Sequence, residues 1–157
     1  MYYNTSLHYC KYMEMTKTRE IIIKDQSETE QFGYELGQKV QPGTVIALIG
    51  DLGTGKTTLT KSIARGLGIN DVITSPTFNI VKEYRSGRLP LFHFDVYRIG
   101  DVDEMFEIGY EEYFFGDGVC VVEWADIIEE IIPEDAMNIR ISYGASEGER
   151  IYEIEEN

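Results

Sequence analysis

The stretch that decides the fold is GDLGTGKTT, residues 50–58, which directly follows the apolar run TVIALI at residues 44–49. It matches the phosphate-binding pattern G-x-x-x-x-G-K-[ST], placed between a predicted strand and a predicted helix as that pattern requires. In such a loop the backbone N–H groups and the positive end of the helix dipole face phosphate oxygens. The stretch therefore predicts a nucleotide-binding α/β domain.

The pattern also assigns roles to individual residues. We expect Lys56 to reach the β- and γ-phosphates of a nucleotide and the Thr57 hydroxyl to bind Mg²⁺. ATP and Mg²⁺ are accordingly the predicted cofactors. The predicted nucleotide contacts are Asp51, Leu52, Gly53, Thr54, Gly55, Lys56, Thr57 and Thr58.

The rest of the chain alternates helices and strands around this loop. The spacing of apolar residues predicts strands at 18–24, 44–49, 78–84, 89–96, 119–123, 138–143 and 150–154, and helices at 27–40, 55–67, 101–115 and 125–132. Ser27-Glu28-Thr29-Glu30 has capping-box spacing and marks the start of the first helix. Only the turn at 85–88 separates two strands, so these must pair antiparallel. The expected fold is α/β, a three-layer P-loop NTPase-like arrangement with a mixed central sheet.

The length of 157 residues fits one domain, which we assign to residues 19–157. Residues 1–18 show neither helical nor strand periodicity and are expected to be a disordered leader or the product of a start codon read too early. The sequence has neither the order of a signal peptide nor an apolar run of about 20 residues, so a cytoplasmic location is expected. Cys10 and Cys120 are far apart and predict neither a disulfide nor a zinc site.

The charge balance limits the partners. Fourteen basic and 28 acidic residues give a formal net charge of −14. Such a chain is not expected to bind nucleic acid strongly through its own phosphate contacts. If RNA is involved, another molecule must hold it, and Mg²⁺ becomes essential for binding an anionic nucleotide.

Two carboxylates end predicted strands close to the loop. Asp95 and Glu123 would lie at the carboxyl edge of the sheet, where open α/β sheets bind ligands. Each could instead cap a turn, and which of them serves Mg²⁺ or water stays open. Neither is followed by a second acid, so we expect slow hydrolysis in isolation. His93 shares the strand face of Asp95, and a structural role in the core is favoured for it over a catalytic one.

Four motifs together resemble the TsaE (YjeE) family of small bacterial ATPases, which are needed for threonylcarbamoyladenosine modification of tRNA. The resemblance runs from about Arg19 to the C-terminal hairpin. Its motifs are GDLGTGKTT at 50–58, Ser75-Pro76-Thr77-Phe78, His93-Phe94-Asp95-Val96-Tyr97-Arg98 and Val122-Glu123-Trp124. The predicted acidic helix, which ends near Gly109-Tyr110-Glu111-Glu112, stands at the position that the family pattern also has.

The resemblance implies specific roles for these residues. Catalysis would depend on Lys56, Asp95 and Glu123, with Mg²⁺ held by Thr57 and Glu123. Coupling or partner contact would involve Ser75, Pro76, Thr77, Phe78 and Trp124. The implied partner is the complex of the proteins TsaD and TsaB, with no strong direct contact to nucleic acid and none to a membrane.

Two other functions share the first motif. A P-loop small-molecule kinase would need a lid with arginines, but Arg85 and Arg88 flank a turn too short for one. A nucleotide-dependent binding module would use ATP to order the 75–78 segment without requiring hydrolysis. The sequence does not identify the residues that contact adenine.

Overall fold

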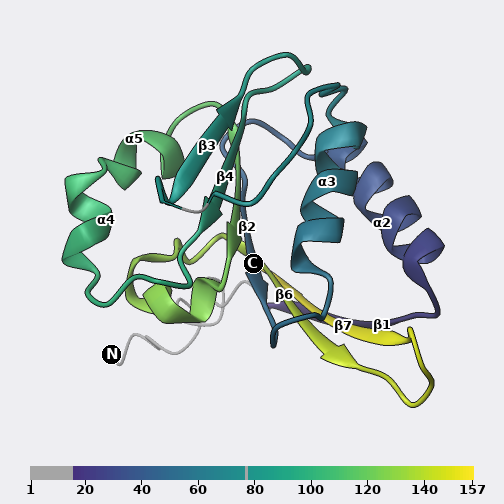
Figure 1. Cartoon of the computed structure of the whole chain (residues 1–157). Helices are drawn as coiled ribbons and strands as arrows, with labels where there is room; N and C mark the ends of the chain where they lie inside the picture. The colour runs from purple at the N-terminus through teal and green to yellow at the C-terminus, as the bar shows by residue number, and fades with distance from the viewer. Residues whose placement is uncertain (1–15, 77) are drawn as a thin grey trace, which may run out of the picture.

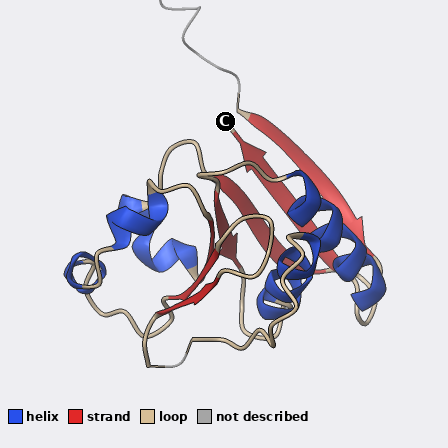
Figure 2. Cartoon of the chain, turned by 90° about the horizontal axis from the view of Figure 1, so that it is seen from above, coloured by secondary structure: helices blue, strands red, loops and turns tan. Residues whose placement is uncertain are grey.

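The computed structural model describes residues 16–76 and 78–157, which form one mixed seven-stranded sheet with helices on both faces (Figures 1 and 2). The strands are β1 (Lys17–Ile23), β2 (Val45–Ile49), β3 (Val81–Tyr84), β4 (Leu91–Asp95), β5 (Val119–Glu123), β6 (Met137–Tyr143) and β7 (Arg150–Glu156). The helices are α2 (Gln26–Lys39), α3 (Lys56–Gly66), α4 (Asp103–Glu107), α5 (Tyr110–Phe114) and the 3₁₀ helix η1 (Ala125–Ile131).

The strand order is β1-β7-β6-β2-β5-β4-β3. The central strand β2 pairs parallel to both β5 and β6, and β4 pairs parallel to β5. The outer pairs β3–β4, β6–β7 and β1–β7 are antiparallel. The predicted mixed sheet and the two predicted hairpins are thus confirmed, and the parallel strands β2, β4 and β5 end at the same edge.

The three-layer prediction is also confirmed, because the sheet separates two apolar cores. One core lies between the sheet and helices α2 and α3, and includes Ile46, Leu59 and Ile63. The other lies under α4, α5 and η1, and includes Phe94, Met105 and Phe114. All five residues of β5 are buried, as expected for a strand covered on both faces.

Helix α2 begins two residues earlier than its predicted capping box. The N-cap is Asp25, whose Oδ1 accepts from the backbone N–H of Glu28 at 3.0 Å. The carboxylate of Glu28 in turn accepts from the N–H of Lys24 at 2.7 Å. The prediction of a box starting at Ser27 was therefore wrong, because Asp25 and Glu28 already satisfy the free N–H groups that a cap must serve.

Three other boundaries differ from prediction. The helix expected over 101–115 is split into α4 and α5, because Gly109 adopts a left-handed conformation with φ of 70°. Strand β3 starts at Val81 rather than at residue 78, after Ile80 with φ of 64°. Strand β1 starts at Lys17, two residues before the expected domain boundary at Arg19. Residues 1–15 of the predicted leader lie outside the described residues.

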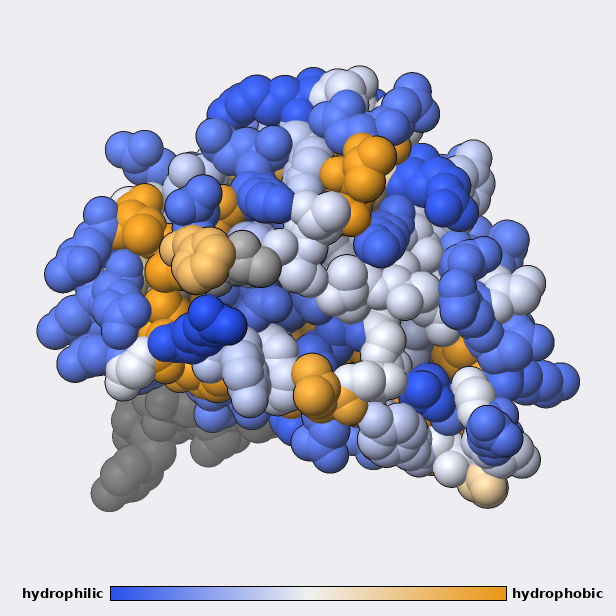
Figure 3. Space-filling view, viewed as in Figure 1, coloured by the Kyte–Doolittle hydropathy of each residue, from blue (hydrophilic) through white to orange (hydrophobic). Residues whose placement is uncertain are grey.

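The face seen in Figure 3 is mostly hydrophilic, and its apolar side chains form small separate groups. This agrees with the excess of acidic residues in the sequence. Within the described ranges, every helix is too short or too polar to cross a membrane.

Candidate nucleotide-binding site

The glycine loop, residues 50–55, joins the end of β2 to the start of α3, as the sequence pattern predicts. Gly53 and Gly55 have φ of 82° and 100°, which a residue with a Cβ adopts only with strain. Thr54 closes the turn by donating from its N–H and its hydroxyl to the carbonyl of Asp51, at 3.2 and 2.8 Å. Among the described residues no side chain caps α3, so its first N–H groups remain available to a ligand.

Lys56 lies at the mouth of this loop and is only 5% exposed. Its Nζ donates to the carbonyls of Gly50 and Asp51 at 2.6 and 2.9 Å, and lies 4.0 Å from the centre of the Trp124 ring. Burial lowers the pKa of Lys56 below its usual value, although the charges of Glu123 and Asp95 oppose that shift. The structure thus fixes this ammonium group where phosphate oxygens would meet the loop.

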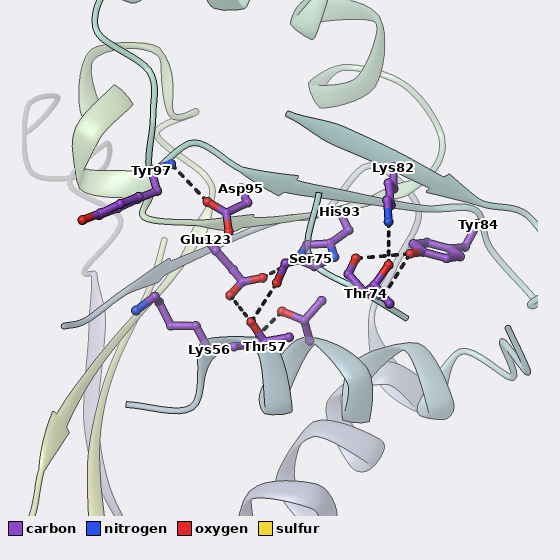
Figure 4. A network of polar contacts seen from close by, with 11 residues as sticks. Lys56, Thr57, Thr74, Ser75, Lys82, Tyr84, His93, Asp95, Tyr97 and Glu123 are labelled. Atoms are coloured by element: carbon purple, nitrogen blue, oxygen red, sulfur yellow. Dashed lines mark hydrogen bonds and ion pairs between the residues drawn. The ribbon is translucent and has the colours of Figure 1, made fainter. Parts of the chain in front are cut away.

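A polar network links α3 to the ends of β4 and β5 (Figure 4). The Thr57 hydroxyl donates to Oε1 of Glu123 at 2.8 Å and lies 3.2 Å from the Ser75 hydroxyl. On the other side of the carboxylate, Oε2 of Glu123 contacts Nε2 of His93. His93 and Glu123 are 0% and 2% exposed, so the network lies inside the protein.

Asp95 is the cross-strand partner of Glu123 in the parallel pair β4–β5, and its side chain is half-buried. Its Oδ1 accepts from the N–H of Tyr97 at 3.1 Å. Burial raises the pKa of the Asp95 carboxyl above its usual value; the Tyr97 N–H opposes this shift, and the charge of Glu123 adds to it. The two strand-end carboxylates predicted from the sequence therefore lie together, but in different environments.

The network fits a magnesium ion in the chemistry of its donor atoms. Across residues 16–76 and 78–157, no group of three His, Cys, Asp or Glu side chains is placed to hold a metal alone. Mg²⁺ usually takes one or two protein oxygens and completes its shell with water and phosphate. The hydroxyl of Thr57 and the carboxylate of Glu123 supply such a pair.

The C-terminal hairpin braces the glycine loop from the outside, a feature that sequence reasoning missed. The Tyr143 hydroxyl donates to the carbonyl of Leu52 at 2.8 Å. The Arg150 guanidinium donates to the carbonyls of Thr54 and Gly53 at 3.0 and 3.3 Å. Three consecutive loop carbonyls are thereby held by β6 and β7. Leu52 itself is 79% exposed.

A cavity of about 250 Å³ lies beside this brace. Its lining combines loop and helix residues with the two outer elements that flank them. The residues are Gln26, Thr29, Gly53, Thr54, Gly55, Thr58, Gly148 and Arg150. Two predicted nucleotide-contact residues, Thr54 and Thr58, therefore line this cavity.

The residues predicted to couple or contact a partner divide into two groups. Trp124 adopts φ of 63° and packs its half-buried ring against Tyr97, with ring centres 4.7 Å apart, and Ser75 reaches Thr57. Pro76 is buried, whereas Phe78 is 87% exposed and lines a cavity of about 330 Å³ that also includes Asp95. Thr77 lies outside the described residues. The structure thus brings Ser75 and Trp124 to the site and leaves Phe78 on the surface.

Comparisons with known proteins agree on one family. The model of the family described as "Threonylcarbamoyl adenosine biosynthesis protein TsaE" matches residues 23–151. The tRNA threonylcarbamoyladenosine biosynthesis protein TsaE of Bacillus subtilis is 47% identical over 129 residues, covering 82% of this chain and 78% of that protein. The protein of the same name from Nostoc is 37% identical over 146 residues, covering 90% and 88%.

A solved structure gives the same result. The crystal structure of Bacillus subtilis YdiB superposes with a TM-score of 0.73 at 41% identity, covering 91% of this chain and 88% of that one. The match spans the sheet and both helical layers. Sequence and fold therefore point to the same relatives.

Proposed function

The chain belongs to the TsaE family, and on that premise we propose that it is an ATPase that binds and slowly hydrolyses Mg-ATP in support of tRNA threonylcarbamoyladenosine modification. The observation that carries the proposal is the buried Lys56 at the uncapped start of α3, next to a hydroxyl and a carboxylate that can share a cation. The glycine loop supplies backbone N–H groups around the same point. Together these groups form a cradle for a triphosphate.

Each group has a distinct part in the proposed reaction. Thr57 and Glu123 would hold Mg²⁺, which neutralises phosphate charge when it is bound. Lys56 would bind the β- and γ-phosphates, where its charge stabilises the transferred group. We assign the water to Asp95 rather than to Glu123, because Glu123 is committed to Thr57 and His93, whereas Asp95 is half-exposed with a raised pKa. A raised pKa makes a carboxylate a better proton acceptor.

The adenosine half of ATP is proposed to occupy the cavity beside the brace. That cavity is lined by Thr54 and Thr58 together with Gln26 and Arg150. A nucleotide whose phosphates wrap around the loop would leave the loop on this side. The first turn of α2 and the C-terminal hairpin would then contact the base and the sugar.

The proposed partner is the TsaD–TsaB complex, with this chain in the cytoplasm. The net charge of −14 supports a protein partner rather than direct binding of tRNA, because RNA phosphates would be repelled. The exposed Phe78 and the segment that carries it supply an apolar surface near Asp95. That surface is where we expect the partner to sense the nucleotide.

The structure does not favour a kinase function, because the two arginines considered for a kinase lid, Arg85 and Arg88, have other partners. Arg88 donates to the carbonyls of Gly37 and Val40 at 2.7 Å each, and so caps the end of α2. Arg85 pairs with Glu83 on its own hairpin at 2.9 Å. Arg88 is therefore engaged in a structural role, and Arg85 lies on a short hairpin rather than on a lid. A binding module that does not require hydrolysis would be distinguished by Asp95→Ala, which in that case should still bind ATP and support modification.

The test combines binding with reconstitution. Lys56→Ala removes a charge-assisted contact of about 1.5–3 kcal/mol, so ATP should bind about ten- to a hundredfold more weakly. Lys61→Ala, on the exposed face of the same helix, is the matched control and should bind as wild type. In a mixture of purified TsaD, TsaB and tRNA, modification should require the wild-type chain with ATP. Unchanged ATP affinity in Lys56→Ala would refute the phosphate cradle.

A further inference from the structure

The carboxylate of Glu123 is held from two sides by residues of two different elements. Thr57 on α3 donates to Oε1 at 2.8 Å, and His93 on β4 contacts Oε2. Glu123 is 2% exposed, so water does not compete for these oxygens. A carboxylate at the end of a strand has free side-chain torsions, and a second partner removes that freedom. Its orientation is therefore set jointly by Thr57 and His93.

The contact with His93 has a defined direction. A carboxylate that binds a cation can only accept hydrogen bonds, so in the proposed site Nε2 of His93 is the donor of this contact. The other ring nitrogen, Nδ1, is buried and has no partner among the described residues. The single polar contact of this fully buried ring is therefore the Glu123 carboxylate.

The sheet register places the His93 ring next to the Glu123 carboxylate. His93 lies directly opposite Val121 on β5, and Glu123 is the next residue on the same strand face. Asp95, two residues further along β4, lies directly opposite Glu123. The imidazole thus reaches the carboxylate diagonally from the core side, whereas Thr57 contacts it from α3. His93 itself is 0% exposed and so cannot touch a bound nucleotide.

We propose that His93 is a positioning residue that orients the Glu123 carboxylate for Mg²⁺, an inference that rests on the proposed function. It acts through Glu123 and does not take part in the chemistry. Residues that orient a metal-binding carboxylate from behind typically change metal affinity or activity about 10- to 100-fold when they are removed. The predicted loss is confined to steps that need Mg²⁺.

The experiment compares ATP affinity in Mg²⁺ with the much weaker ATP affinity expected in EDTA, by calorimetric titration of the folded chain at high protein concentration. His93→Leu and His93→Asn remove the donor at the Nε2 position, and each should lose about 10- to 100-fold of the Mg²⁺-dependent gain in affinity. Their affinities in EDTA should stay within about twofold of wild type, since the phosphate cradle is untouched. His93→Gln places an amide N–H near the Nε2 position and should restore most of the gain. If His93→Leu does not fold, His93→Asn and His93→Gln still form a matched polar pair.

Val121→Ala is the control for disturbed packing, because Val121 is the fully buried cross-strand neighbour of His93 and has no polar contact. It should keep the wild-type ratio of the two affinities. The positioning role would be overturned if His93→Leu and His93→Asn both kept the wild-type ratio of ATP affinity in Mg²⁺ to ATP affinity in EDTA. It would also be overturned if His93→Gln lost as much of the Mg²⁺-dependent gain as they do. Either result would leave the proposed function intact. Absence of ATP binding by the wild-type chain would instead defeat the proposed function and the positioning role with it. Nitrogen NMR of the imidazole gives a second readout: we expect a protonated Nε2, and a bare Nε2 would also overturn the proposal.

Discussion

The placement of α3, and with it Lys56 and Thr57, depends on a close crossing of α2 and α3 at glycines. Gly37 of α2 and Gly66 of α3 face each other there. A Cβ built on Gly37 would lie 2.2 Å from the carbonyl oxygen of Ile63 and 2.8 Å from Cα of Gly66. A Cβ on Gly66 would lie 2.2 Å from the carbonyl oxygen of Tyr34. Both obstacles are backbone atoms, which cannot rotate away.

Gly37→Ala therefore sets two effects against each other. Replacing a helical glycine by alanine stabilises the helix by about 1 kcal/mol. Against this, ordinary contact starts at 3.4 Å, so the helices must separate by 3.4 − 2.2 Å, or about 1.2 Å, at their crossing point. Overpacking of this kind costs about 3 kcal/mol when no side chain can yield. We expect a net destabilisation of about 2 kcal/mol, which lowers Tm by about 4–8 °C in a chain of this size.

Thermal and urea unfolding monitored by circular dichroism would measure the change. Gly100→Ala is the matched control, because its new Cβ would lie 3.6 Å from the nearest atom, in ordinary contact with Glu104. Its free energy of unfolding should stay within about 0.5 kcal/mol of wild type. The two effects in Gly37→Ala have opposite signs, so the outcome is decisive. A variant as stable as wild type, or more stable, would show that propensity dominates and that the helices are not locked by this contact.

Two further predictions concern the site. Arg150→Met removes both hydrogen bonds from the guanidinium to the glycine loop. Because water can replace these bonds at a partly exposed position, we expect ATP binding to weaken by about 1 kcal/mol, or about fivefold, in a calorimetric titration. Arg65→Met, on the exposed face of α3, is the control and should bind ATP as wild type does. The raised pKa of Asp95 means that its carboxyl group binds a proton more tightly in the folded state than in the unfolded state. The stability that this group contributes is therefore present below pH 3.8, and it is lost as the pH rises through the pKa of the folded state. Asp95→Asn should therefore gain stability relative to wild type as the pH rises from about 3.8 toward neutrality. Urea unfolding of both proteins across this pH range would measure the difference in their free energies of unfolding. A difference that stays constant with pH would contradict the raised pKa of Asp95.

The parts of the site that the sequence could predict are those set by local chemistry. The glycine loop follows from its own residue pattern, and Asp95 and Glu123 follow from their positions at the ends of apolar runs. Parallel strands bring such ends to one edge whatever the remaining residues are. The direct pairing of Asp95 with Glu123 in the β4–β5 register confirms that expectation. The same reasoning placed His93 on the face of Asp95, but could not show that its side chain contacts Glu123.

The rest depends on contacts between segments that are distant in the chain. Arg150 reaches Thr54 across 96 residues, and Tyr143 reaches Leu52 across 91. Neither residue stands in a pattern that predicts its partner, because the turn of the hairpin decides which side chains face the loop. The split of the predicted helix at Gly109 was missed for a different reason. A glycine inside a helical pattern is usually tolerated, and only its left-handed conformation ends the helix.

The contacts around the glycine loop are asymmetric, and this bears on how a partner could read the nucleotide. On one side Tyr143 and Arg150 hold three loop carbonyls against the rigid hairpin of β6 and β7. On the other side the Thr57 hydroxyl lies 3.2 Å from the Ser75 hydroxyl, at the start of the 75–78 segment. A cation that engages Thr57 would compete directly for that hydroxyl. We therefore expect any nucleotide-dependent change to pass to the Ser75 side, where Phe78 is exposed, and not to the braced side.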